Sequence, residues 1–139
     1  MKLFQSQSIL THTGVMTMLT AAVAKAEQID CPQCIVIVDA SGELLGEIRM
    51  TGAKFLSRKS AKSKALTAAS IRAPSANIPE SVRVTIGLAS NGSVTGLVGG
   101  LPILKDGALL GGIGIGSGSP EQDLSVATAA LEAISADPI

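Results

Sequence analysis

Two carboxylates and two cations are the side chains of this sequence best suited to acid–base chemistry on a small organic acid. Asp39 ends an apolar run and Asp123 follows a glycine-rich stretch, and either carboxylate can exchange a proton with a substrate. Arg49 and Lys64 carry charges that can hold a substrate carboxylate. Each acid also has a structural interpretation, because Asp39 can close an Asx-turn and Asp123 can stabilise a helix dipole. These four residues are the candidate catalytic groups of a metal-independent isomerase or hydrolase.

His12 is the single histidine, which removes most Ser-His-Asp and Cys-His schemes and the metal sites built from several histidines. It can serve as one axial ligand of haem iron, or it is an exposed residue near a helix start. Cys31-Pro32-Gln33-Cys34 is a CxxC motif, but it follows a helical pattern and precedes a strand, whereas a redox pair needs a helix N-terminus. A structural zinc site needs four ligands, which this chain does not offer near the pair. We expect ordinary reduced cysteines and no metal or zinc site.

The segment Gly112-Ile113-Gly114-Ile115-Gly116-Ser117-Gly118-Ser119 matches neither a dinucleotide fingerprint nor a P-loop, because its last glycine position is a serine and no lysine follows. Read as a strand, it places glycines on one face and isoleucines on the other. A bare glycine face lets a helix, another subunit or a flat ligand approach the backbone. The N-terminus of the helix that follows offers N–H groups to a carboxylate. The candidate ligand-binding residues are therefore Gly112, Gly114, Gly116, Gly118 and Gln122, with His12.

The first half of the chain reads as a helix, a hairpin and a second helix. Apolar spacing predicts a helix over residues 11–29, which Thr11 or Thr13 can cap. Strands are expected at 35–39 and 44–50 around a turn at 40–43, and a helix at 54–71 before a proline-containing loop at 73–81.

The second half favours strands and ends in a helix. Residues 82–86 fit either a strand or a short helix, and 94–98 read as a strand. A Lys-Asp-Gly turn predicts a hairpin over 102–110, with the returning strand at 108–115. Ser119 and Pro120 predict the start of a helix over 120–134. This order of elements predicts an α+β fold around an antiparallel sheet.

The helix at 54–71 carries a basic run, Arg58, Lys59, Lys62 and Lys64. Runs of charge on helices usually form solvated faces, and this is the expectation here. A site for an anion or a carboxylate is the alternative, with Arg49 as a second contributor.

Composition narrows the class of protein. The 139 residues fit one domain, 46% of them are hydrophobic, and with two Phe and no Tyr or Trp the core must be aliphatic. Such small side chains leave little area to bury, which favours self-association. The 11 basic and 11 acidic residues balance, and stacking aromatics are nearly absent, so nucleic acid is not an expected partner.

The N-terminal segment has an Ala24-Lys25-Ala26 pattern like a signal-peptidase site. Polar residues interrupt the apolar stretch before it, and its helical spacing favours a helix of the mature fold. No apolar run reaches 18 residues, so no membrane span is expected. We expect a cytoplasmic protein.

The segments "AVAKAEQ", "CIVIVDASGELLGEIRMTGA", "SKALTAAS" and "GGLPILKDGALLGGIGIGSGSPEQD", in this order, resemble the GlcG/HbpS-like (haem-degrading) family over residues 11–134. Two positions depart from the family pattern: Thr51 stands where an Asp is usual, and Gly116-Ser117-Gly118 is a shifted S-G-G. The resemblance implies a profilin-like antiparallel sheet flanked by helices (α-β-α), usually in symmetric oligomers.

The resemblance also implies several functions. Some family members bind haem, some relatives are fused to corrinoid adenosyltransferases, and others act in small-molecule catabolism. In related haem-binding domains a histidine near the first helix can ligate iron, which points to His12. Three hypotheses follow: an oligomeric binder of haem or a carboxylate-bearing metabolite, an enzyme of organic-acid or ring-compound catabolism, and a scaffold whose glycine face forms the oligomer interface.

Overall fold

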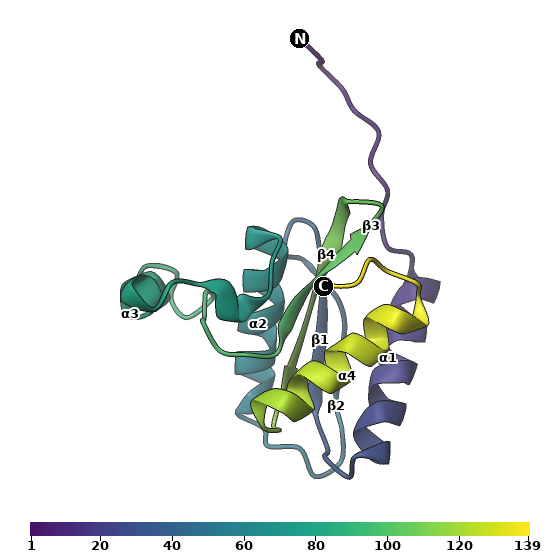
Figure 1. Ribbon diagram of the computed structural model, residues 1–139, viewed down its shortest axis with the longest axis vertical. Coiled ribbons are helices and arrows are strands. Elements are labelled where there is room, and N and C mark those ends of the chain that lie inside the picture. The colour runs from purple at the N-terminus through teal and green to yellow at the C-terminus, as the bar shows by residue number, and fades with distance from the viewer.

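A computed structural model describes residues 1–139 and contains a four-stranded antiparallel sheet in the order β2-β1-β4-β3 with helices on both faces (Figure 1). This is the α+β fold that the order of elements predicts. The strands are β1 Cys34–Asp39, β2 Leu44–Arg49, β3 Gly100–Lys105 and β4 Ala108–Gly116. The helices are α1 His12–Gln28, α2 Ser57–Ile71, α3 Arg83–Ala89 and α4 Pro120–Ala133, with short 3-10 turns at Ser75–Asn77 and Glu80–Val82.

The larger core lies between the sheet and the pair α1 and α4. Alternate residues of β1 and β4 point to this side, and the side chains that enter the core are all aliphatic. They pack against apolar residues of the two helices, among them Met18, Ala22 and Val126, which are fully buried. The sheet side of this core is made by Ile35, Ile37, Ile113 and Ile115. Aliphatic packing alone therefore builds the core, as the lack of aromatic residues requires.

Helix α2 covers the other face of the sheet, and it lies directly on the glycines of β4. A Cβ atom built on Gly114 would collide with the carbonyl oxygen of Ala61, and one on Gly112 with that of Ala65. A Cβ on Gly116 would lie 2.9 Å from the oxygen of Ser57. Of the three alternatives for this glycine face, the helix is correct: α2 covers it, and the face has no room for a flat ligand or another subunit.

Local signals located most elements correctly. Thr11 caps α1 through its side chain, which accepts a hydrogen bond from Gly14 N, and Ser119 with Gln122 forms a capping box at α4. Of the two alternatives for residues 82–86, the helix is correct. Helix α2 begins at Ser57, after a turn at residues 54–56.

The strand expected at 94–98 does not form. Its backbone is held by side chains instead of a neighbouring strand: Thr95 N donates to Thr67 Oγ1 at 3.0 Å, and Val94 N donates to Ser90 Oγ at 3.0 Å. Hydroxyl groups that satisfy backbone N–H donors compete with a strand ladder in this way. The segment therefore runs as an irregular return of the chain from α3 to β3.

Residues 72–99, called the arm below, leave the body of the molecule between α2 and β3 and carry α3 (Figure 1). None of the residues of α3 is buried. An isolated helix of seven residues has only marginal stability in water. Because no residue of α3 is buried, its apolar side chains are available for contact with another molecule. Val84 and Leu88 are 78% and 79% exposed.

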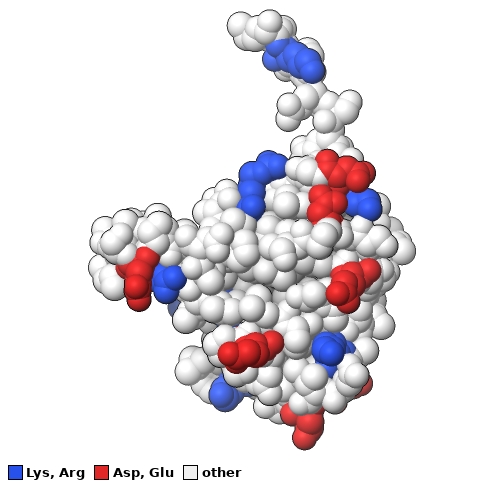
Figure 2. Space-filling model, in the orientation of Figure 1, with Lys and Arg blue, Asp and Glu red and all other residues white.

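The side of the molecule on which α4 lies carries acidic and basic side chains singly or in small mixed groups, with wide uncharged areas between them (Figure 2). This side shows no patch of one sign, of the kind that a nucleic-acid backbone attracts. No helix combines the length and the apolar character needed to cross a membrane.

The Lys-Asp-Gly hairpin turn forms as expected and is fastened to the C-terminal segment. Asp106 and Gly107 have φ angles of 50° and 77°, the left-handed conformations that a two-residue hairpin turn requires. The Asp137 carboxylate accepts hydrogen bonds from Asp106 N at 2.9 Å and Gly107 N at 2.8 Å. These backbone donors stabilise the charged form and lower the pKa of Asp137 below its ordinary value.

Replacing Asp137 with Asn should destabilise the protein at neutral pH. Because the folded-state pKa of Asp137 is lowered, its contribution is fully present above the unfolded-state pKa and is lost as the pH falls through the folded-state pKa. Urea unfolding at pH 7 and in the acid range should therefore show a difference between wild type and Asp137→Asn that shrinks on acidification. The control is Glu132→Gln, an exposed carboxylate without a hydrogen-bond partner. A pH-independent difference would contradict the proposed role of the carboxylate.

Candidate functional site

Two of the candidate catalytic residues, Lys64 and Asp123, form a buried ion pair. Lys64 Nζ lies 3.0 Å from Asp123 Oδ2 and also donates to the carbonyl oxygen of Ile115 at 2.7 Å. The two side chains are only 6% and 3% exposed. Since Lys64 belongs to α2 and Asp123 to α4, the pair joins helices that lie on opposite faces of the sheet.

Further polar groups complete the surroundings of the pair. Gly118 N donates to Asp123 Oδ1 at 3.0 Å, and the amide nitrogen of Gln33 reaches the same oxygen at 3.0 Å and the carbonyl oxygen of Gly116. Every buried polar side-chain atom has a hydrogen-bond partner. The network is thus saturated, which is the condition for a buried charge pair to be tolerated.

Glycines make room for this network. Gly99 has a φ of 125°, and a Cβ atom there would lie 3.0 Å from Lys64 Nζ and 3.1 Å from Asp123 Cβ. A Cβ on Gly118 would lie 2.6 Å from the Gln33 amide and 2.8 Å from Asp123 Oδ1. The candidate ligand residue Gly118 therefore packs against the ion pair, where no space is open to a ligand.

The basic run divides between two environments. Arg58, Lys59 and Lys62 are exposed, as a solvated face predicts, but Lys64 is buried, so the expectation of a solvated face is wrong at this residue. Its position explains the difference, because Lys64 shares the sheet-facing side of α2 with Ala61 and is one residue from Ala65.

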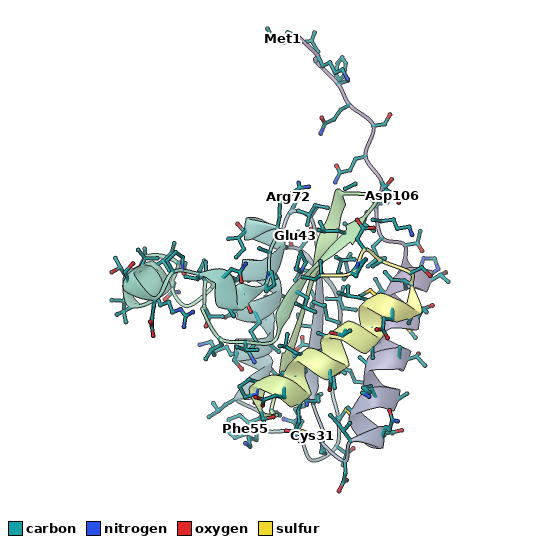
Figure 3. The ribbon with its side chains drawn as sticks, in the orientation of Figure 1. Met1, Cys31, Glu43, Phe55, Arg72 and Asp106 are labelled. Carbon is teal, nitrogen blue, oxygen red and sulfur yellow. The ribbon has the colours of Figure 1, made fainter.

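Asp39 is remote from Asp123. Its Oδ1 accepts hydrogen bonds from Ser41 N at 2.8 Å and Glu43 N at 3.0 Å, which closes the turn between β1 and β2. Figure 3 shows Glu43 at one end of the molecule and Cys31, which precedes β1, at the other. The structure therefore gives Asp39 the Asx-turn geometry and does not bring the two carboxylates into one site.

Arg49 lines a groove of about 450 Å³ between the end of α1 and the end of β2. The sulfur-containing residues Met50 and Cys31 and the acidic residues Glu27 and Asp30 also line this groove. The groove therefore has both signs of charge, and Arg49 is the single candidate catalytic residue that lines it.

The remaining candidates are placed as follows. The Gln122 side chain belongs to the capping box, where its Oε1 accepts from Ser119 N at 2.8 Å. His12 is the first residue of α1 and is exposed. Both cysteines are free thiols, and burial raises the pKa of each, which makes them poor nucleophiles. No three His, Cys, Asp or Glu side chains gather in a group that could hold a metal ion.

A groove of about 660 Å³ lies between α2 and the arm. Lys59, Lys62 and Arg83 line it, together with apolar residues of the arm, and no carboxylate does. This α2–arm groove contains part of the basic run for which the sequence left an anion site open. Sequence reasoning missed Arg83, because its segment read equally well as a strand.

The ion pair should be a structural link whose halves depend on each other. Lys64→Met leaves Asp123 charged and buried, so we expect a loss of about 3–5 kcal/mol in the free energy of unfolding. The double variant Lys64→Met/Asp123→Asn removes both charges and keeps an acceptor for Gly118 N, so it should be more stable than the single variants together predict. Urea unfolding of Lys64→Met, Asp123→Asn and the double variant measures these free energies.

Lys62→Met is the matched control, since this exposed lysine lies two positions earlier on the same helix. Its stability should stay within about 0.5 kcal/mol of wild type. Strictly additive losses in the double variant would show that the two charges do not interact.

Comparison with known proteins identifies one family and several relatives of this chain. The family model described as "Haem degrading protein HbpS-like" matches residues 10–132. The corrinoid adenosyltransferase PduO of Citrobacter freundii is 38% identical over 119 residues, which are 82% of this chain and 36% of PduO. The chain thus spans about a third of the length of that relative. An uncharacterized 15.0 kDa protein from the dhaT-dhaS intergenic region of Citrobacter freundii is 31% identical, with 94% of this chain and 97% of that protein covered.

Solved structures agree with the sequence comparison. The Klebsiella pneumoniae protein ORFY has a TM-score of 0.91 and 26% identity, with 99% of both chains covered. The complex of PduOC with haem has a TM-score of 0.87 and 31% identity, and covers 94% of this chain and 98% of PduOC. HbpS has a TM-score of 0.82 and 28% identity, with 94% and 93% covered. On its sequence, its strand order and these likenesses, the chain belongs to the HbpS-like family.

Proposed function

We propose that this protein binds haem, or a carboxylate-bearing metabolite of similar size, without catalysing a reaction on it. The observation that carries the proposal is the likeness to PduOC, which has been solved as a complex with haem and shares 31% identity over nearly the whole of both chains. The α2–arm groove adds support from this chain itself, since about 660 Å³ lies within the range of small-molecule sites.

The residues present fit the porphyrin more clearly than they fit the iron. Leu66, Val84, Leu88 and Leu97 offer aliphatic surface in the α2–arm groove, and the cations suit the propionate groups of haem. Coordination of the haem iron would also need an axial ligand from the protein. His12 is the single histidine, and it lies exposed on α1, outside every groove described above.

The alternative of a metal-independent isomerase or hydrolase has no comparable support. Asp39 holds a turn at the far end of β1 from Asp123, and Lys64 is engaged by Asp123. No pair of these residues is free to hold a substrate and to move its proton.

We further propose that the protein self-associates through the uncovered face of β2. Strand β2 is an edge of the sheet, and on the side of α2 no helix covers it. Phe55 and Leu56 lie beside this face and are 66% and 72% exposed. Glu47 and Arg58 line the same shallow groove, so two copies related by a two-fold axis can place opposite charges against each other.

Titration of haem into the full-length protein tests the proposed function. Binding should shift and sharpen the Soret absorbance and saturate with added haem, because the porphyrin leaves water for an aliphatic groove. The same titration of protein unfolded in urea is the control. A spectrum identical to that of free haem at every ratio would contradict the proposal.

Sedimentation velocity tests the proposed self-association. Wild type should sediment as an oligomer, and Phe55→Asp should shift it toward smaller species, because a charge would be buried against apolar surface. Met16→Asp is the control, since Met16 is 61% exposed on α1, away from β2's uncovered face. A monomeric wild type, or an unchanged Phe55→Asp variant, would refute this interface.

A further inference from the structure

We propose that the α2–arm groove is the ligand site and that it recognises the carboxylate-bearing edge of a planar apolar molecule of the porphyrin class through Lys59, Lys62 and Arg83. This inference rests on the proposed function and deepens it, because it names both the site and the part of the ligand that the site reads.

The charge of the groove is uncompensated. Lys64–Asp123 is the one ion pair of the structure, so Lys59 and Lys62 have no carboxylate within 4.0 Å. They are three positions apart on α2 and therefore share one side of the helix. Glu47 is the nearest acid that shares a groove with them, and it belongs to the shallow groove on their other side. An anion in the α2–arm groove would supply the missing negative charge.

Arg83 is held in a fixed orientation. Its Nε donates to the carbonyl oxygen of Ile78 at 2.9 Å, and Nη2 donates to that of Ala76 at 3.0 Å. Its side chain also passes against Gly96, where a Cβ atom would collide with it. These contacts leave Nη1 without a protein partner, so the guanidinium can donate to a ligand carboxylate while it ties the two halves of the arm together.

The wall opposite the lysines is apolar. Val84 and Leu88 are mostly exposed, and Leu97 is 55% exposed, although all three line the groove. Leu66 of α2 lines it as well. A ligand with an apolar body and a charged edge matches this division, since its body can cover the arm residues while its carboxylates face α2.

The other grooves fit such a ligand less well. The groove beside Arg49 has two carboxylates, Glu27 and Asp30, in its lining, and the shallow groove beside β2 has Glu47. In each of these two grooves an anionic ligand would meet carboxylates as well as cations, and the carboxylates would repel it. The α2–arm groove is the one of the three that has cations alone and is also the largest.

No His, Cys or Met lines the α2–arm groove, and His12 lies on α1, across the sheet from α2. Recognition in this site therefore uses the periphery of the ligand rather than a metal at its centre. Iron-free protoporphyrin should bind about as well as haem, and loss of the carboxylate charges should weaken binding.

The test is a fluorescence titration of the full-length protein with protoporphyrin IX and with its dimethyl ester. Lys59→Glu/Lys62→Glu should raise the Kd for protoporphyrin at least about tenfold, and the ester should bind wild type weaker by a similar factor, because both changes remove charge-assisted contacts. Lys2→Glu/Lys54→Glu makes the same change in net charge at exposed lysines outside the groove and should leave the Kd within about twofold. Leu88→Asn should weaken both porphyrin and ester, since it alters the apolar wall.

The outcomes separate the two proposals. If wild type binds neither haem nor protoporphyrin, the proposed function is wrong. If wild type binds haem but Lys59→Glu/Lys62→Glu and Leu88→Asn, with unchanged thermal unfolding, leave the Kd unaltered, the function stands and the assigned site is wrong. Binding of haem but not of protoporphyrin, abolished by His12→Ala, would move the site to α1 and overturn the inference in the same way.

Discussion

Helix α2 lies against the backbone of β4, and this close approach determines how the rest of the chain is arranged. It requires glycine at Gly112, Gly114 and Gly116 on the strand, and alanine at Ala61 and Ala65 on the helix, so that carbonyl oxygens of one element meet Cα atoms of the other. Small residues on both sides leave little side-chain area to bury there. The main hydrophobic core is accordingly on the opposite face, where the isoleucines of the same strands meet α1 and α4.

The close packing of α2 also determines the surroundings of its charged side chains. Because α2 packs closely on the sheet, Lys64 is buried, and a buried ammonium group needs hydrogen-bond or charged partners. Ile115 O and Asp123 provide them, and through Asp123 the helix on one face becomes linked to the helix on the other. Gln33, Gly118 and Gly99 are then constrained as well, because they supply donors or space to the same network. Residues that look like catalytic groups in the sequence thus serve as a connection between layers.

The sequence predicts best where the determining interaction is local. Ser119 with Gln122, the Lys-Asp-Gly turn and the alternation of glycine and isoleucine in β4 each depend on neighbours a few residues away, and each gave the correct element. It fails where the partner is distant. Thr67 satisfies the backbone of the segment once expected to be a strand, and Asp123 neutralises Lys64 from another helix. The alternation shows which face of β4 is bare, but not which element covers it.

The arm is fastened to α2 by a hydroxyl group, since Ser63 Oγ donates to Gly92 O at 2.6 Å. A second hydroxyl group joins the two ends of the arm, since Ser75 Oγ donates to Leu97 O at 2.6 Å. Its outer residues touch neither of the two buried clusters. Stability and surface chemistry are therefore carried by separate sets of residues. Substitutions at Val84 or Leu88 alter what the groove presents while the packing of the sheet stays the same, so within this fold the outer arm is free to diversify without loss of the scaffold.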